Sequence, residues 1–73
     1  MKIKKLEIKN LPYILDKDID ELINVINSGK KLYDCEMGEV LGDINQCESC
    51  KLIDSITAQL LRDYYINGGM FNG

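Results

Sequence analysis

Two cysteines with a spacing that can bind metal lie in the second half of the chain, in the stretch Cys47-Glu48-Ser49-Cys50. Such a C-x-x-C pair can hold zinc or run thiol–disulfide exchange. A structural zinc site takes four ligands, but the chain has three cysteines and no histidine. Cys35 lies about 18 Å from Cys47 along a continuous helix, and it cannot then share a metal with it.

A metal site at Cys47 and Cys50 would therefore need a dimer, in which two pairs form one Cys₄ site between subunits. A redox role is disfavoured because the pair does not begin a helix that follows a strand. The simpler interpretation makes Cys47 a small core residue and places Cys50 near a turn. We expect no cofactor and no resident metal.

Other catalytic patterns are missing from the sequence. No paired carboxylates, phosphate-binding glycine loop or nucleophile–base pair stands out, and without histidine the commonest general base is lacking. A chain of 73 residues also leaves little room for a deep cleft. We expect a protein that is not an enzyme.

The lysines near the N-terminus are the candidates for binding nucleic acid: Lys2, Lys4, Lys5 and Lys9. The three expected helices also invite comparison with a helix-turn-helix, whose last helix would read bases through Ser55, Thr57, Gln59 and Arg62. From position 33 to 66, however, seven acids face two basic residues, a balance that opposes phosphate binding. Weak nucleic-acid binding through the lysines is a second alternative, and a solvated edge strand explains them better.

Large apolar side chains near the C-terminus suggest a surface for a protein partner. A core this small cannot cover all of Tyr33, Met37, Tyr64, Tyr65, Met70 and Phe71. We therefore expect an exposed patch around Tyr65, Met70 and Phe71. The favoured function is a non-catalytic protein-interaction or regulatory module with an unidentified protein partner, and a homodimer is possible. The first alternative is a metal-linked or redox accessory that uses Cys47 and Cys50 in a dimer.

The expected compartment is the cytoplasm. The first ten residues alternate lysine with isoleucine and leucine where a signal peptide has a continuous apolar stretch, and no run of about 18 apolar residues occurs. An odd number of cysteines in such a chain is typical of reduced thiols. We expect neither export nor a membrane span.

These side chains would be positioned by a single, mainly α domain covering residues 1–73. Its parts are an extended or short-strand segment over 1–13, a compact three-helix core over 14–66 and a tail over 67–73. Pro12 closes the first part because proline disfavours helix at the residue before it. The helices are expected near 17–28, 32–49 and 55–66, with Asp54 capping the third.

Apolar residues at helical spacing define the faces that should be buried. The first face comprises Ile14, Leu15, Ile19, Leu22, Ile23 and Ile26. The second comprises Tyr33, Met37, Val40, Ile44 and Cys47, and the third comprises Ile56, Leu60, Leu61 and Tyr64. Leu22 and Leu60 lie in the middle of their faces, so we expect both in the core. Gly38 and Gly42 lie beside the second face, where close approach of a neighbouring backbone would explain them better than a bend.

Two stretches of the sequence support a resemblance. Asp34-Cys35 through Gly42-Asp43-Ile44-Asn45 matches the pattern D-C-x-x-x-E-L-x-G-x-I-N except that Val40 stands at its leucine, and positions 58–66 match A-x-x-L-R-x-x-Y-L except that Ile66 stands at its last leucine. In these stretches the chain resembles small uncharacterised proteins of phages and conjugative transposons in low-GC Gram-positive bacteria. That family often opens its third helix with Ser-Pro-Glu, where this chain has Asp54-Ser55-Ile56, and has no regular counterpart of Cys47 and Cys50. The resemblance implies a mobile-element setting and no particular activity.

Overall fold

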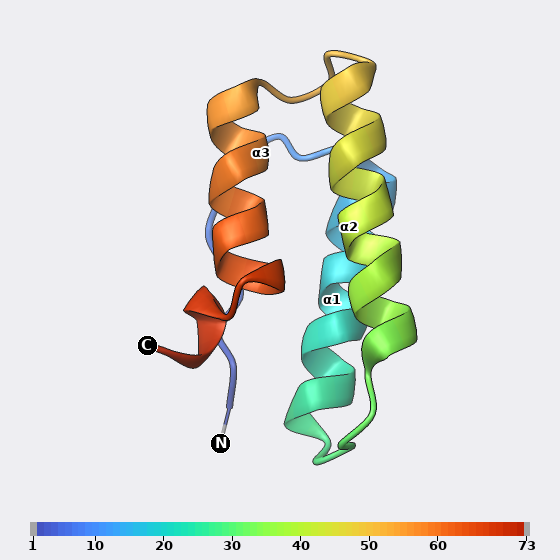
Figure 1. Cartoon of the computed structure of the whole chain (residues 1–73), viewed down its shortest axis with the longest axis vertical. Helices are drawn as coiled ribbons and strands as arrows, with labels where there is room; N and C mark the ends of the chain where they lie inside the picture. Colours follow the sequence, from blue (N-terminus) through green and yellow to red (C-terminus); the bar gives the residue numbers. More distant parts are fainter. Residues whose placement is uncertain (1, 73) are drawn as a thin grey trace.

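Three helices form the body of the protein, and the computed structural model describes residues 2–72. Helices α1 and α3 run in one direction and α2 runs in the other (Figure 1). The elements are α1 (Tyr13–Asn27), α2 (Asp34–Ser49), α3 (Ser55–Leu61), a π-helical turn η1 (Arg62–Ile66) that continues α3, and a 3₁₀ turn η2 (Gly69–Phe71). No strand occurs between residues 2 and 72. The predicted three-helix core with an extended N-terminal segment is confirmed.

Helix α1 begins four residues earlier than the predicted start at position 17. Pro12 stands at its N-cap with φ −53° and ψ 142°, and the Asp16 amide donates to the Pro12 carbonyl at 3.0 Å. Proline suits the start of a helix because its φ is already close to helical and its missing N–H needs no partner there. The sequence analysis treated Pro12 only as a stop, and it also starts the helix.

Helix α3 begins where the sequence predicted, at the cap residue Asp54. The Asp54 carboxylate accepts a hydrogen bond from the Thr57 amide at 2.7 Å, which satisfies one of the free amides of the first turn. The other end widens into the π turn, in which the Asn67 amide donates to the Arg62 carbonyl at 2.9 Å. η2 then folds back so tightly that a Cβ on Gly69 would lie 2.8 Å from the Asp63 carbonyl oxygen.

The core lies between the three helices and the N-terminal segment. Its buried members are Ile3, Leu15, Ile19, Leu22, Ile23, Val40, Ile44, Cys47, Ile53, Ala58, Leu61, Tyr65 and Met70. The predicted face of α2 is confirmed, since Tyr33 and Met37 also pack against this cluster. The predicted face of α1 is confirmed except at Ile14, which is exposed.

The predicted buried face of α3 is wrong for two of its four residues. Ile56 and Leu60 point to solvent, and Ala58 and Tyr65 are buried beside Leu61. Ala58, Leu61 and Tyr65 also follow helical spacing, so the segment offers two apolar faces, and its neighbours decide which one is buried. The small Ala58 lets α3 lie close to α2.

The explanation offered for Gly38 and Gly42 is also wrong. Both glycines are exposed on α2, and a Cβ built on either would meet nothing within 4 Å. No neighbouring backbone approaches them, and α2 continues without interruption from Asp34 to Ser49. Nothing in the structure explains why these two positions are glycine.

The N-terminal segment, residues 2–12, fills the third side of the bundle. In the described part of the chain, no Cα of α1 lies within 8 Å of a Cα of α3 or η1. The segment runs behind α3 and crosses to the start of α1 (Figure 1). It buries Ile3 in the core, and Leu6 and Ile8 pack against the core from outside. The segment therefore substitutes for direct packing between α1 and α3.

Substituting two leucines tests which helix faces are buried and which are exposed. Leu22 is fully buried, so Leu22→Ala should lower the free energy of unfolding by about 2–5 kcal/mol. Leu60 is 52% exposed, so Leu60→Ala should cost less than about 1 kcal/mol. Urea denaturation followed by circular dichroism measures both. A larger loss for Leu60→Ala than for Leu22→Ala would contradict the orientation of α3.

Candidate interaction surface

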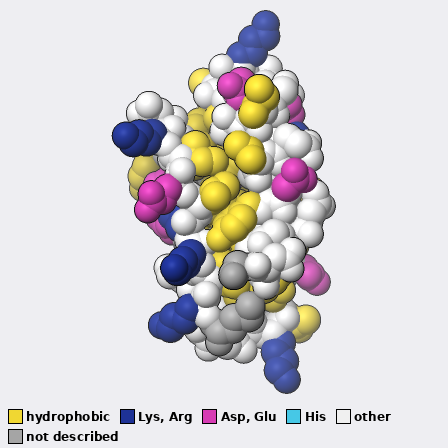
Figure 2. Space-filling model, turned by 90° about the vertical axis from the view of Figure 1, so that its left-hand side faces the viewer, with side chains coloured by type: hydrophobic (Ala, Val, Ile, Leu, Met, Phe, Trp, Pro, Cys, Tyr) yellow, Lys and Arg dark blue, Asp and Glu magenta, His cyan; other side chains and the backbone are white. Residues whose placement is uncertain are grey.

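Three large apolar side chains, each four residues after the last, are exposed in α3 and in the loop before it. Leu52 is 62% exposed, Ile56 is 75% exposed and Leu60 is 52% exposed. Ile56 and Leu60 are four residues apart and so share one side of the helix, and Leu52 lies in the loop that leads into α3. Figure 2 shows hydrophobic side chains running down the face of the molecule that includes α3. We call Leu52, Ile56 and Leu60 the apolar row.

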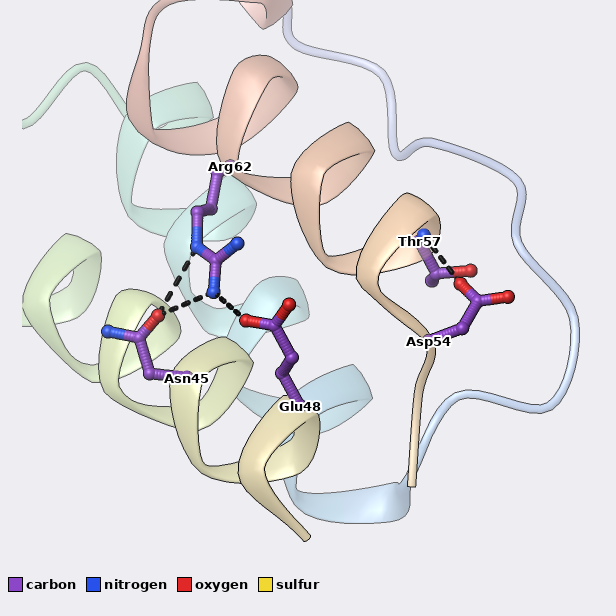
Figure 3. Close-up of polar contacts among 5 residues, drawn as sticks. All are labelled: Asn45, Glu48, Asp54, Thr57 and Arg62. Carbon is purple, nitrogen blue, oxygen red and sulfur yellow. Dashed lines mark hydrogen bonds and ion pairs between the residues drawn. The ribbon is translucent and has the colours of Figure 1, made fainter. Parts of the chain in front are cut away.

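Polar contacts of Arg62 join η1, the continuation of α3, to α2. The Arg62 guanidinium donates to the Asn45 side-chain oxygen at 2.8 Å from Nη2 and 3.2 Å from Nε, and it pairs with the Glu48 carboxylate (Figure 3). This contact also keeps the pKa of Glu48 below its usual value. Both partners lie on α2, so Arg62 fixes the rotation of α3 against α2.

A shallow depression lies at the Leu52 end of the apolar row. Its volume is about 450 Å³, and it is lined by Glu48, Lys51, Leu52, Ile53, Asp54 and Ser55. Two apolar residues, two acids and one lysine thus line one surface hollow.

The patch predicted at Tyr65, Met70 and Phe71 does not exist as an exposed surface. Tyr65 is fully buried and Met70 is 3% exposed, so that only Phe71, at 36%, reaches solvent substantially. The physical reason is that η2 folds back on η1 and carries Met70 into the core, while the Tyr65 hydroxyl finds a buried partner in the N-terminal segment. The prediction of exposure at Tyr65 and Met70 is wrong.

The cysteine pair lies at the C-terminal end of α2, with its two thiols in different surroundings. Cys47 is buried and Cys50 is exposed, as the simpler interpretation predicted. Burial raises the pKa of the Cys47 thiol, and the charges of Asp43 and Cys50 raise it further, which disfavours the reactive thiolate. The Cys50 sulfur accepts a hydrogen bond from the side-chain nitrogen of Gln46 at 3.2 Å. Within residues 2–72, neither cysteine belongs to a group of three or more potential metal ligands.

The N-terminal lysines do not form one free basic surface. The Lys5 ammonium lies 2.5 Å from an Asp16 oxygen and 2.8 Å from an Asp20 oxygen, both on α1. These two carboxylates raise the pKa of Lys5, chiefly through the hydrogen bonds they accept. Lys2, Lys4 and Lys9 are exposed.

An acidic seam joins α1 to α2 on another part of the surface. Carboxylate oxygens of Asp18, Glu21 and Glu39 lie within 4.8 Å of one another. Asp43 adjoins them, and its Oδ2 atom is buried without a hydrogen-bond partner in the described chain. Two ionised carboxylates can only accept hydrogen bonds, so a proton shared between Asp43 and Asp18 would satisfy this atom.

The seam therefore makes Asp43 easier to protonate than an ordinary aspartate. Burial, then the hydrogen bond and charge of Asp18, then the charge of Glu39 raise the pKa of Asp43 from 3.8 to about 6. These residues were not predicted to form a site. Their signal was present, since Asp18 and Glu21 lie three apart on α1 and Glu39 and Asp43 lie four apart on α2.

Comparison with known proteins does not assign the chain to a family. No family model, curated protein or solved structure matches it. None of the helices within residues 2–72 combines the length and apolar character that a membrane crossing requires. The function must be inferred from the chain's own surface.

Asp43→Asn should stabilise the protein at pH 7.5 and remove part of its pH dependence. A carboxyl whose pKa is raised by folding stabilises the fold when protonated, and this contribution is lost as pH rises through about 6. The amide mimics the protonated form, so we expect a gain of about 1–2 kcal/mol at pH 7.5 and little change near pH 4. Glu7→Gln, which removes an exposed acid, is the control. Equal effects of both changes in urea melts at pH 4 and 7.5 would contradict the shared proton.

Proposed function

We propose that this protein is a non-catalytic protein-interaction module that binds a partner through the apolar row of Leu52, Ile56 and Leu60. The observation that supports this proposal is their exposure beside an intact core. The bundle already buries Ala58 and Leu61 on the other side of α3, so the fold does not need Ile56 or Leu60 to be apolar. Exposed apolar side chains grouped on one helix face are typical of interaction sites.

The charge of the protein indicates the chemistry of the partner. Helix α1 carries four acids and one lysine, and α2 carries five acids and no basic residue. On the α3 side, Asp54 precedes Ile56 and Asp63 follows Leu60, and both acids are exposed. A partner with an apolar stripe flanked by lysine or arginine would match this arrangement, and its approach would be accelerated by the acidic field.

The size of the apolar row favours a short segment over an extensive interface. Three side chains expose a few hundred Å² at most, whereas a stable protein–protein interface buries about 800 Å² per partner. An amphipathic helix that lays three or four anchors against α3 fits this size. The row is too small to support a permanent homodimer by itself. We also propose that the protein belongs to a mobile genetic element, as the resemblance implies.

Ile56→Asp and Leu60→Ser should abolish partner binding and leave the fold unchanged. Both residues are exposed, so neither change removes core packing. Immobilised wild-type and variant chains would be compared for the proteins they capture from the source cells, followed by titration of the purified candidate. Asn24→Asp, which adds the same charge at an exposed site on α1, is the control.

The expected result is a partner that binds the wild-type chain and the Asn24→Asp variant and is lost from both apolar-row variants. Binding should weaken with salt, since the flanking acids contribute. If folded Ile56→Asp and Leu60→Ser chains capture the same proteins as the wild type, the apolar row is not the interaction site.

A further inference from the structure

The N-terminal segment is held by side chains that recognise its backbone. The Asn27 side-chain oxygen accepts from the Ile3 amide at 2.6 Å, and the Asn27 side-chain nitrogen donates to the Ile3 carbonyl at 3.2 Å. One carboxamide thus pairs with both polar groups of one residue, as a neighbouring strand would. This recognition requires an extended peptide and does not depend on the side chain at position 3.

Two adjacent tyrosines of η1 continue this backbone recognition. The Leu6 amide donates to the Tyr65 hydroxyl at 2.8 Å, and the Tyr64 hydroxyl donates to the Lys4 carbonyl at 2.6 Å. The two rings meet edge to face, with centroids 4.8 Å apart and an interplanar angle of 89°. Asn27 on α1 and the tyrosines on η1 therefore form the two sides of one groove.

Two side chains of the segment add selectivity to the groove. Ile3 is 5% exposed and inserts into the core. Lys5 reaches the carboxylates of Asp16 and Asp20, one helical turn apart on α1. The groove thus recognises an extended segment with an apolar residue, any residue, lysine and a further apolar residue in succession, as in Ile3-Lys4-Lys5-Leu6.

Residues 7–11 connect the segment to α1, and Ile8 and Leu11 among them pack against the core. Within the described chain, residues 7–11 make no hydrogen bond to the bundle, and Asn10 adopts a left-handed backbone with φ 63°. Helix α1 is started independently by Pro12. The segment can therefore leave the groove without unwinding α1.

We propose that this groove is a binding site for extended peptide that also accepts residues 2–8 of a second copy, so that two chains exchange their N-terminal segments. The contacts are identical whether the segment comes from the same chain or from another. The chain's own segment is favoured by its high effective concentration, which is of the order of millimolar for short tethers. Exchange therefore dominates only when the protein itself approaches that concentration. This site is separate from the apolar row and does not depend on the proposed function.

The test uses a fluorescent peptide of residues 2–10 and full-length chains. Ile3→Asp combined with Lys5→Glu should release the chain's own segment and leave the groove open. We expect saturable peptide binding to this variant by fluorescence anisotropy, and at least tenfold weaker binding to the wild-type chain. Adding Asn27→Ala to the released variant should weaken binding about five- to tenfold, whereas adding Asn24→Ala should not. A peptide that carries both charge substitutions should not bind.

Several results would overturn the proposal. One is that the peptide shows no saturable binding to a released variant whose circular dichroism remains helical. Another is that the peptide binds the wild-type chain as tightly as the released variant, which would place the peptide outside the groove. If the double variant unfolds, Lys5→Glu alone provides the same comparison with a smaller expected gain. The proposal also predicts a dimer by sedimentation near millimolar concentration that Ile56→Asp preserves, and a strictly monomeric protein there would refute the exchange.

Discussion

The structure depends on filling the space between α1 and η1, because among the described residues no Cα atom of one lies within 8 Å of a Cα atom of the other. Helix α2 contacts both, but its single apolar face cannot close the far side of the core. The N-terminal segment closes that side through Ile3, and the buried Tyr65 ring packs in the core while its hydroxyl accepts the Leu6 amide. A fully buried hydroxyl without a partner would cost about 1–3 kcal/mol. Burial of Tyr65 and docking of the segment therefore require each other.

The way the core is closed explains why apolar side chains are exposed on α3 and acids on α1 and α2. Because the segment closes the α1–η1 side and Arg62 holds η1 against α2, the remaining side of α3 carries Ile56 and Leu60 into solvent. The acids gather on α1 and α2, where the proximity of Asp18 raises the pKa of Asp43, and Lys5 pairs with both Asp16 and Asp20. The apolar and acidic features that support the proposed interaction are thus consequences of how the core is closed.

The sequence was sufficient to predict the buried face of a helix that has a single apolar stripe, and a cap that depends on local residues. The faces of α1 and α2 are each the single apolar stripe of a long helix, and the Asp54 cap is a local interaction between Asp54 and Thr57. The face of α3 was not determined locally, because Ile56 and Leu60 are more hydrophobic than Ala58. Tertiary contacts select the second stripe, namely the hydrogen bond of Tyr65 with Leu6, 59 positions away, and the pairing of Arg62 with α2. The same holds for the candidate sites: the positions of Cys47 and Cys50 were predicted, whereas the burial of Tyr65 and Met70 was not.

Hydrogen exchange at two neighbouring amides tests the central claim that the N-terminal segment is an integral part of the core. The Leu6 amide donates to the buried Tyr65 hydroxyl, whereas the Glu7 amide has no partner within the described residues. The account predicts that Leu6 is protected at least 100-fold more strongly than Glu7 in the wild-type chain, and that Tyr65→Phe removes most of this difference. Exchange of Leu6 at the rate of an unstructured peptide, while the helices remain protected, would contradict it.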